Sequence, residues 1–169
     1  MIRPLQARAL ILAAVLVLAD QASKYWLIGV TREAGGSIEL TGFFNLVMVW
    51  NRGISFGLFQ SGDTGRWLLS ALAAGVGIVL LIWLRRVDKP LIGYGIGAVL
   101  GGAVGNLIDR VSPRAAVADF FDFHLMGYHW PAFNVADAAI TLGVGAILLH
   151  SFIDDGSRTG AAQRTEPRP

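Results

Sequence analysis

The stretch FNVADAAITLGVGAILLHSF, at residues 133–152, decides the fold. It matches the roughly 20 predominantly apolar residues that a helix needs to cross about 30 Å of hydrocarbon. Its only carboxylate, Asp137, lies one turn inside its start. An ionisable group in a membrane span is costly and usually faces a partner or a cavity. Asp137 is therefore the first candidate for a functional residue.

Three further stretches, at residues 9–28, 67–84 and 91–108, have the same apolar character and similar length. The whole chain is 54% hydrophobic and only 15% charged, which places it outside the range of soluble domains. The sequence predicts a mainly α membrane protein with four transmembrane helices in a single domain, residues 1–153. The segment 154–169 is rich in Gly, Thr, Arg and Pro and predicts a disordered cytoplasmic tail.

Basic residues predict which side of the membrane each connection faces. They precede the first span, join the second to the third, and follow the fourth: Arg3, Arg8, Arg85, Arg86, Lys89, Arg158, Arg164 and Arg168. Cytoplasmic connections are enriched in Lys and Arg, so both termini are expected in the cytoplasm. The opposite connections also carry arginines, so the bias is incomplete. These arginines fit anionic lipid headgroups, and no nucleic-acid partner is expected.

The external connection between the first two spans contains SIELTGFFNLVMVWN, residues 37–51, in which Gly42 separates two extended runs. Alternation along the second run predicts a small external β-sheet at the membrane surface. In the third span, four glycines at four-residue spacing predict a face that another helix backbone can approach closely. They are Gly93, Gly97, Gly101 and Gly105.

Polar residues of separate spans converge at the external end of the predicted bundle. At about 1.5 Å of rise per residue, Asp20 and Lys24 lie towards the external end of the first span. The third span ends, and the fourth begins, at the same level. The converging residues are Asp20, Lys24, Asn106, Asp109, Arg110 and Asp137. Such convergence favours a functional site.

Some of these residues also have an ordinary structural explanation. Asp20 and Lys24 are four residues apart, so they lie on one helical face and could neutralise one another. Asn134 could cap the fourth span, with Asp137 stabilised at the third helical position. Taken alone, Asp137 fits a cap as well as a catalyst.

The segment VADFFDFHL, residues 117–125, supplies a second carboxylate on an external loop. In an extended chain Asp119 lies in an apolar row with Phe121, whereas Asp122 lies on the other, more polar face. Burial raises the pKa of a carboxylic acid, and a second carboxylate raises it further. Two aspartates that share one proton can activate a water and protonate the scissile carbonyl oxygen, as in aspartic proteases. Asp119 and Asp137 are the candidates for this pair, in preference to Asp122.

Other catalytic groups fit the sequence less well. Ser23 and Lys24 are consecutive on a helix and point about 100° apart, so they do not form a serine–lysine dyad. An external metal site has suitable ligand types but lacks the two-histidine helical spacing of a zinc protease. Its candidate ligands are Asp119, Asp122, His124 and His129. The absence of cysteine excludes thiol nucleophiles and thiolate metal sites.

Two classes other than a protease stay open at this point. A small ion or proton transporter could use the intramembrane aspartates and Lys24 as a relay, although the middle spans carry no ionisable residue in their cytoplasmic halves. A non-enzymatic assembly protein could bind partner helices through the glycine face, and would leave Asp119 replaceable.

Five blocks in this order resemble the lipoprotein signal peptidases, the type II signal peptidases of bacteria: ADQASKYW, NRGISFGLF, GGAVGNLIDR, VADFFDF and PAFNVADAAITLG. They cover nearly the whole chain from residue 20 to residue 143. The resemblance implies an aspartic endopeptidase of the bacterial inner membrane, with its active site near the periplasmic face. Such an enzyme removes the signal peptide from diacylglyceryl-modified prolipoproteins by cutting before the lipidated cysteine.

The resemblance also implies roles for individual residues. It places the catalytic pair on Asp119 and Asp137, with no metal and no organic cofactor. The other motif positions fall on Asp20, Lys24, Asn51, Gly53, Asn106, Asp109, Arg110, Asn134 and Ala136. Among them Arg110 and Asn51 suit hydrogen bonding to the substrate backbone. We expect a monomer among membrane lipids, whose substrate enters laterally and unwinds between the third and fourth spans.

Overall fold

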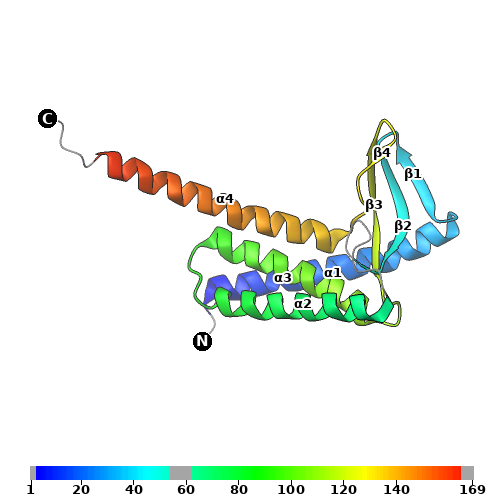
Figure 1. The fold of residues 1–169 in the computed structure, drawn as a ribbon, viewed down its shortest axis with the longest axis horizontal. Helices are drawn as coiled ribbons and strands as arrows, with labels where there is room; N and C mark the ends of the chain where they lie inside the picture. Colours follow the sequence, from blue (N-terminus) through cyan, green and yellow to red (C-terminus); the bar gives the residue numbers. More distant parts are fainter. Residues whose placement is uncertain (1–2, 54–61, 165–169) are drawn as a thin grey trace.

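The computed structural model describes residues 3–53 and 62–164, with side chains described as far as Ile153 (Figure 1). Four helices in these residues are each long and apolar enough to cross a membrane: α1 (Pro4–Glu33), α2 (Gly62–Leu84), α3 (Pro90–Val111) and α4 (Val135–Arg164). The predicted fold class is therefore confirmed. Residues 54–59 of the block NRGISFGLF lie outside the described residues.

Helix α4 continues to Arg164, whereas the sequence predicts a disordered tail from residue 154. Each residue added to an existing helix gains a backbone hydrogen bond, and no proline interrupts the chain before Pro167. The helix can therefore extend past the apolar stretch on local grounds. Residues 165–169 of the predicted tail lie outside the described residues.

Four antiparallel strands form a sheet across one end of the helix bundle (Figure 1). They are β1 (Ser37–Thr41), β2 (Phe44–Asn51), β3 (Val117–Leu125) and β4 (Tyr128–His129), in the order β1-β2-β3-β4. The predicted sheet at residues 37–51 is confirmed, and β3 adds to its edge. The β3–β4 turn has positive φ at Met126 (50°) and Gly127 (83°), as a two-residue type I′ turn requires.

Helix α1 ends in a backbone arrangement that glycine makes possible. Gly36 N donates to Thr31 O at 2.7 Å and Gly35 N donates to Arg32 O at 3.3 Å, which is the Schellman pattern. Gly35 and Gly36 have φ of 79° and 103°, in the region that disfavours residues with a Cβ. The chain therefore leaves α1 sharply and enters β1.

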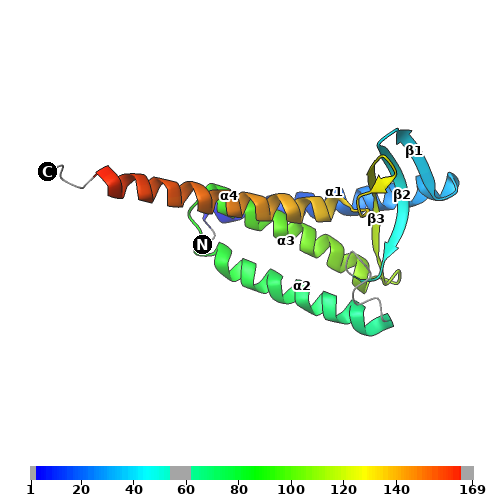
Figure 2. The ribbon, with the colours of Figure 1, turned by 45° about the horizontal axis from the view of Figure 1, so that its top comes forward.

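Helix α3 is the centre of the bundle, with α1 and α4 packed against it and α2 on another side (Figure 2). The predicted glycine face is directed at α1. A Cβ added at Gly101 would lie 2.8 Å from Ala13 O on α1, and one added at Gly95 would lie 2.8 Å from Gly143 O on α4. These distances are too short for any side chain, so glycine sets how closely the three helices approach.

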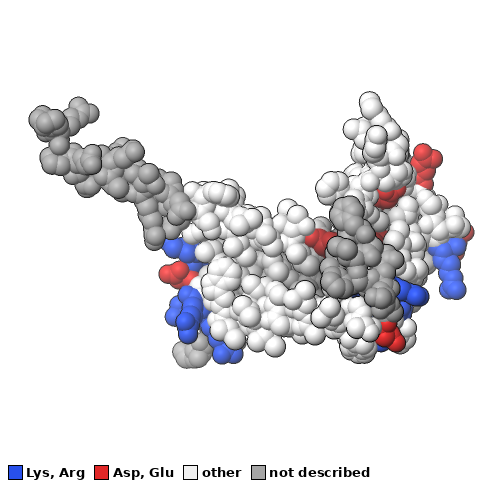
Figure 3. All heavy atoms as spheres, viewed as in Figure 1, with Lys and Arg blue, Asp and Glu red and all other residues white. Residues whose placement is uncertain are grey.

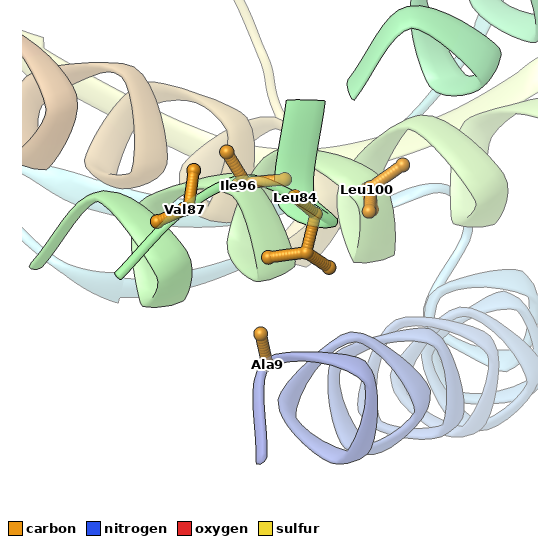
Figure 4. Close-up of a cluster of buried hydrophobic side chains, with 5 residues drawn as sticks. All are labelled: Ala9, Leu84, Val87, Ile96 and Leu100. Atoms are coloured by element: carbon orange, nitrogen blue, oxygen red, sulfur yellow. The ribbon is translucent and has the colours of Figure 1, made fainter. Parts of the chain in front are cut away.

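A cluster of buried apolar side chains lies away from the sheet, where α1 and the α2–α3 connection meet α3. Its buried members are Ala9, Leu84, Val87, Ile96 and Leu100 (Figure 4). Charged side chains on the visible face gather near the two ends of the helices, and the flank between them is largely uncharged (Figure 3). This distribution is the one expected of a protein whose flank faces hydrocarbon.

Candidate active site

A buried lysine joins two buried carboxylates at the sheet end of the bundle. Lys24 Nζ lies 2.9 Å from Asp20 Oδ2 and 2.9 Å from Asp109 Oδ2, and none of the three side chains is more than 1% exposed. The predicted pairing of Asp20 with Lys24 is confirmed, and Asp109 from α3 joins it. Because removal of one charge would leave the others buried and uncompensated, this cluster fastens α1 to α3.

The same two carboxylates hold backbone N–H groups of neighbouring elements. Asp20 Oδ1 accepts a hydrogen bond from Ala136 N at 3.0 Å, in the first turn of α4, where N–H groups have no partner within the helix. A negative charge at this position is also favoured by the helix dipole. Asp109 Oδ2 accepts from Ala118 N at 3.2 Å, near the start of β3. The cluster thus fixes the start of both elements that carry the candidate catalytic pair, Asp119 in β3 and Asp137 in α4, which is called the dyad below.

Two asparagines connect the lysine to the candidate dyad. Asn106 Oδ1 accepts from Lys24 Nζ at 3.2 Å, and Asn106 Nδ2 donates to Asp137 Oδ1 at 2.7 Å. Asn134 Nδ2 donates to Asp119 Oδ1 at 2.6 Å and to Asn106 Oδ1 at 3.2 Å. Asp119 and Asp137 are therefore the two ends of one hydrogen-bonded chain. Three separate elements, β3, α3 and α4, contribute to it.

Asp137 also belongs to the cap of its own helix. Asp137 N donates to Asn134 Oδ1 at 3.0 Å, and Asn134 N donates to Asp137 Oδ2 at 3.2 Å. This reciprocal pair is a capping box with Asn at the N-cap and Asp at the third helical position. The capping role predicted for Asn134 is confirmed. The cap holds the Asp137 carboxylate at the end of the bundle that lies next to the sheet.

Asp119 lies in strand β3, whereas the sequence predicts a loop at this position. The strand pairing that places it opposite Val49 is made with a segment about 70 residues earlier in the chain, which local sequence does not reveal. The side chain is 2% exposed. Asn51 Nδ2 donates to Asp119 Oδ2 at 3.0 Å, and Asn51 Oδ1 accepts from Gly53 N at 3.0 Å. Asn51 and Gly53, both predicted as site residues, thus lie at the Asp119 carboxylate, Asn51 in direct contact and Gly53 through Asn51.

Burial raises the pKa of Asp119, and the neighbouring Asp137 carboxylate raises it further. Hydrogen bonds from Asn51 and Asn134 and the charge of Lys24 act in the opposite direction, and the resulting pKa is about 7. Near neutral pH a substantial fraction of Asp119 therefore carries a proton. A protonated carboxyl beside an ionised one is what acid–base hydrolysis of a peptide bond requires.

Asp122 lies in a separate polar group of the sheet. Asn45 Nδ2 donates to Asp122 Oδ2 at 3.1 Å, and His129 Nδ1 lies 2.9 Å from both carboxylate oxygens. Burial raises the pKa of Asp122, but the hydrogen bonds from His129 and Asn45 outweigh it, so the pKa lies below its usual range. Asp122 is therefore held as a carboxylate, in contrast to Asp119.

Arg110 is half-buried at the end of α3, and its charge acts on Asp119, Asp137 and Asp109. Its side chain is partly open to solvent, unlike the buried Lys24 ammonium. Sequence reasoning missed one member of that cluster, Gln21. Its Nε2 lies 3.1 Å from Asp20 Oδ2 and 3.2 Å from Asp109 Oδ1.

The competing sites proposed from the sequence are not assembled. In the part of the chain that the structure describes, no group of three or more His, Asp or Glu residues lies close enough to hold a metal ion. His124 and His129 instead stack with ring centroids 4.9 Å apart. Ser23 Oγ donates to Asp20 O at 2.8 Å and so takes part in its own helix.

Comparison with known proteins covers both the sequence and the fold. A family model described as signal peptidase (SPase) II matches residues 12–153. A curated lipoprotein signal peptidase of Caulobacter vibrioides is 44% identical over 149 residues, which are 87% of this chain and 88% of the relative. One of Methylobacterium radiotolerans is 44% identical over 169 residues, which are 98% of both chains.

Two solved structures described as bacterial membrane enzymes share the fold. The first has a TM-score of 0.71 at 26% identity and covers 96% of this chain and 94% of its own. The second has a TM-score of 0.69 at 30% identity and covers 85% and 92%. The similarity therefore includes both the helices and the sheet.

Proposed function

This chain belongs to the signal peptidase II family, the lipoprotein signal peptidases, and on that premise we propose that Asp119 and Asp137 form its catalytic dyad. The protein is a multi-pass membrane peptidase that cleaves signal peptides from prolipoproteins. The main support for this assignment is the chain of hydrogen bonds through Asn134 and Asn106, which joins the two carboxylates at the sheet end of the bundle.

The two carboxyl groups act with one shared proton. Protonated Asp119 donates to the oxygen of the scissile carbonyl while ionised Asp137 takes a proton from the attacking water. The water oxygen bonds to the carbonyl carbon and gives a neutral tetrahedral diol. Asp137 then returns its proton to the peptide nitrogen, the carbon–nitrogen bond breaks, and a hydroxyl proton returns to Asp119. Each turnover therefore restores the starting protonation of the pair.

Asn51, Asn134 and Asn106 orient the two carboxylates, since each donates to one of the four carboxylate oxygens. Asn51 and Arg110 are the groups best suited to bind the substrate backbone. Arg110 keeps a permanent positive charge beside the dyad and offers several N–H donors. The buried cluster of Lys24, Asp20 and Asp109 supports the site from within the helix bundle and does not contact the substrate.

The substrate is expected to enter laterally from the bilayer, between α3 and α4. Gly95 and Gly143 bring the two helix backbones together near the start of α3, away from the sheet, so we place the entry at the sheet end, beside the dyad. We place the signal helix in hydrocarbon beside the sheet end of the bundle, with the segment to be cleaved extended towards the dyad and cut before the lipidated cysteine. Acyl chains of the diacylglyceryl group then stay in hydrocarbon.

Charge and the positions of the helix ends support the orientation expected from the sequence. Pro4 and the end of α4 lie away from the sheet, at the same end of the bundle as the basic α2–α3 connection (Figure 1). By the positive-inside rule that end is cytoplasmic, so the dyad faces the periplasmic side of the bacterial inner membrane. A monomer is expected, because α1, α3, α4 and the sheet of one chain supply the site residues named above, all of them within the described ranges 3–53 and 62–164.

The test is cleavage of a purified diacylglyceryl prolipoprotein by wild type and three Asp→Asn variants. Asp119→Asn and Asp137→Asn should each lower the cleavage rate by a factor of about 10² to 10⁴, the usual contribution of a positioned acid or base. Asp122→Asn, a buried aspartate of the same strand outside the dyad, is the matched control and should keep its activity. Thermal unfolding of each variant establishes that it is folded.

Full activity in folded Asp119→Asn or Asp137→Asn would defeat the mechanism. A parallel assay with the same prolipoprotein lacking the diacylglyceryl group tests substrate recognition. Equal cleavage of the two substrates would contradict the requirement for the lipid.

A further inference from the structure

A groove lies outside the proposed dyad, where the end of α1, the back of the sheet and the α3–β3 connection meet. It consists of two adjoining hollows of about 640 and 500 Å³, which share Ile28 and Arg114. The larger is lined by Tyr25, Trp26, Ile28, Gly29, Val30, Glu33 and Arg114. The smaller is lined by Ile28, Thr31, Arg32, Gly36, Met48, Trp50 and Arg114.

The groove opens on the face of β2 that is turned away from the dyad. Asn51 donates to Asp119, so the side chain of Asn51 lies on the dyad side of the strand. Successive side chains of a strand point to opposite faces, so Trp50 and Met48 line the other side. Occupation of this groove therefore leaves the dyad open.

The charge in the smaller hollow has one sign. Its only ionisable lining residues are Arg32 and Arg114, both exposed, and neither has an ion-pair partner among the described residues. Glu33 lines the larger hollow only. Ile28, Met48 and Trp50 give the smaller hollow an apolar floor. Two guanidinium groups above such a floor match a phosphodiester attached to a hydrocarbon chain.

The backbone around Arg114 holds this arginine in place. Arg114 N donates to Ser112 Oγ at 3.3 Å, and Ala115 N donates to Ser112 O at 3.0 Å. Ala115 has φ of 55°, a left-handed conformation that is unusual for a residue with a Cβ. The connection is therefore a defined turn that brings Arg114 to the groove.

The groove lies at the depth of lipid headgroups. At about 1.5 Å per residue, the 30 residues of α1 extend some 45 Å, the thickness of a bilayer with its headgroups. The last two turns of α1, which line the groove, therefore lie beyond the hydrocarbon. Tyr25 and Trp26, at the hydrocarbon end of the larger hollow, are 83% and 65% exposed, and amphipathic rings favour this interface.

We propose that this groove binds the phosphate headgroup of an anionic membrane phospholipid between Arg32 and Arg114. The acyl chains run down α1 past Tyr25 and Trp26, over apolar side chains such as Leu18, which is 69% exposed. The site anchors the sheet to the membrane surface at a point separate from the substrate. The proposal of this lipid site depends on the membrane-spanning fold and not on the proposed catalytic role of Asp119 and Asp137.

The test uses full-length protein, purified in detergent and stripped of lipid, and titrated with phosphatidylglycerol while bound lipid is counted by native mass spectrometry. Each basic residue at an anionic membrane surface contributes about a fivefold factor, so Arg32→Gln/Arg114→Gln should weaken binding roughly 25-fold. The matched control is Arg66→Gln, an arginine at the same end of the bundle but outside the groove. It should bind within about twofold of wild type.

Phosphatidylglycerol binding that is unchanged in the double variant would overturn the proposal, as would an equal loss in Arg66→Gln. Competition with inorganic phosphate distinguishes a site for a phospholipid headgroup from a site for free phosphate. A lipid that is also held by its chains resists millimolar phosphate, and full displacement would refute the assignment to a membrane lipid. Thermal unfolding of the single variants Arg32→Gln and Arg114→Gln confirms that both are folded.

Discussion

Replacement of Lys24 by Met is the most informative perturbation of stability in this protein. Lys24 Nζ is the only cation within 4.0 Å of Asp20 and Asp109 among the described residues, and all three side chains are shielded from solvent. Methionine retains the length of the side chain but removes the charge and the donor to Asn106. Two carboxylates would then be buried without a counter-charge.

The size of the effect follows from this geometry. Breaking a buried ion pair by removing one partner costs about 3–5 kcal/mol, because an uncompensated charge stays behind. For a domain of this size 1 kcal/mol shifts Tm by about 2–4 °C, so Lys24→Met should lower Tm by roughly 6–20 °C. Activity should fall as well, because the cluster holds the starts of α4 and β3.

The assay is thermal unfolding in detergent, followed by tryptophan fluorescence. Lys89 is the only other lysine of the chain and is exposed, so Lys89→Met is the matched control and should shift Tm by less than about 2 °C. The double variant Lys24→Met/Asp109→Asn should lose less stability than the sum of the losses of its two single variants. The second change removes one of the buried carboxylates that Lys24→Met leaves without a counter-charge. A Tm for Lys24→Met within the range of the control would refute the reasoning.

Three further predictions concern the dyad, the helix packing and the α3–β3 turn. The pKa of Asp119 is raised to about 7, so the proposed acid loses its proton above that pH, and kcat/KM should fall about tenfold per pH unit from pH 8 upward; a rate that stays constant from pH 6 to 9 would contradict this. Gly143→Ala places a Cβ 2.6 Å from Gly95 O and should cost about 1–3 kcal/mol in thermal unfolding, whereas Gly145→Ala, which has open space, should be neutral or slightly stabilising. Ala115→Gly relieves a φ of 55° and should raise Tm by a few degrees, and an unchanged or lower Tm would show that the turn is not strained.

Much of the fold could be predicted from sequence because a membrane imposes simple rules. Apolar length locates the helices, and the glycine period of α3 predicts its close packing. The cap at Asn134 and the pairing of Asp20 with Lys24 depend on residues three or four positions apart, which local sequence reveals. Each of these features is set by the chain within one helix.

The parts that sequence did not reveal depend on contacts between distant segments. The strand at Asp119 forms because β2 supplies its hydrogen-bonding partner, and nothing in residues 117–125 specifies that partner. Gln21 appears ordinary beside Asp20 until α3 brings Asp109 to its amide at 3.2 Å. The contact between α3 and α4 at Gly95 and Gly143 could not be predicted either, because the glycine pattern does not say which helix each glycine faces. Only the packed structure decides which glycine faces which helix.

The capping box at the start of α4 ties the integrity of the active site to one end of a helix. Helix ends fray at temperatures where the rest of a domain stays folded. Here fraying would release Asn134 from Asp119 and Asp137 together, so heat should inactivate the enzyme before it unfolds the bundle. The amide protons of Ala136 and Asp137, held by Asp20 and Asn134, would report this opening directly in hydrogen exchange.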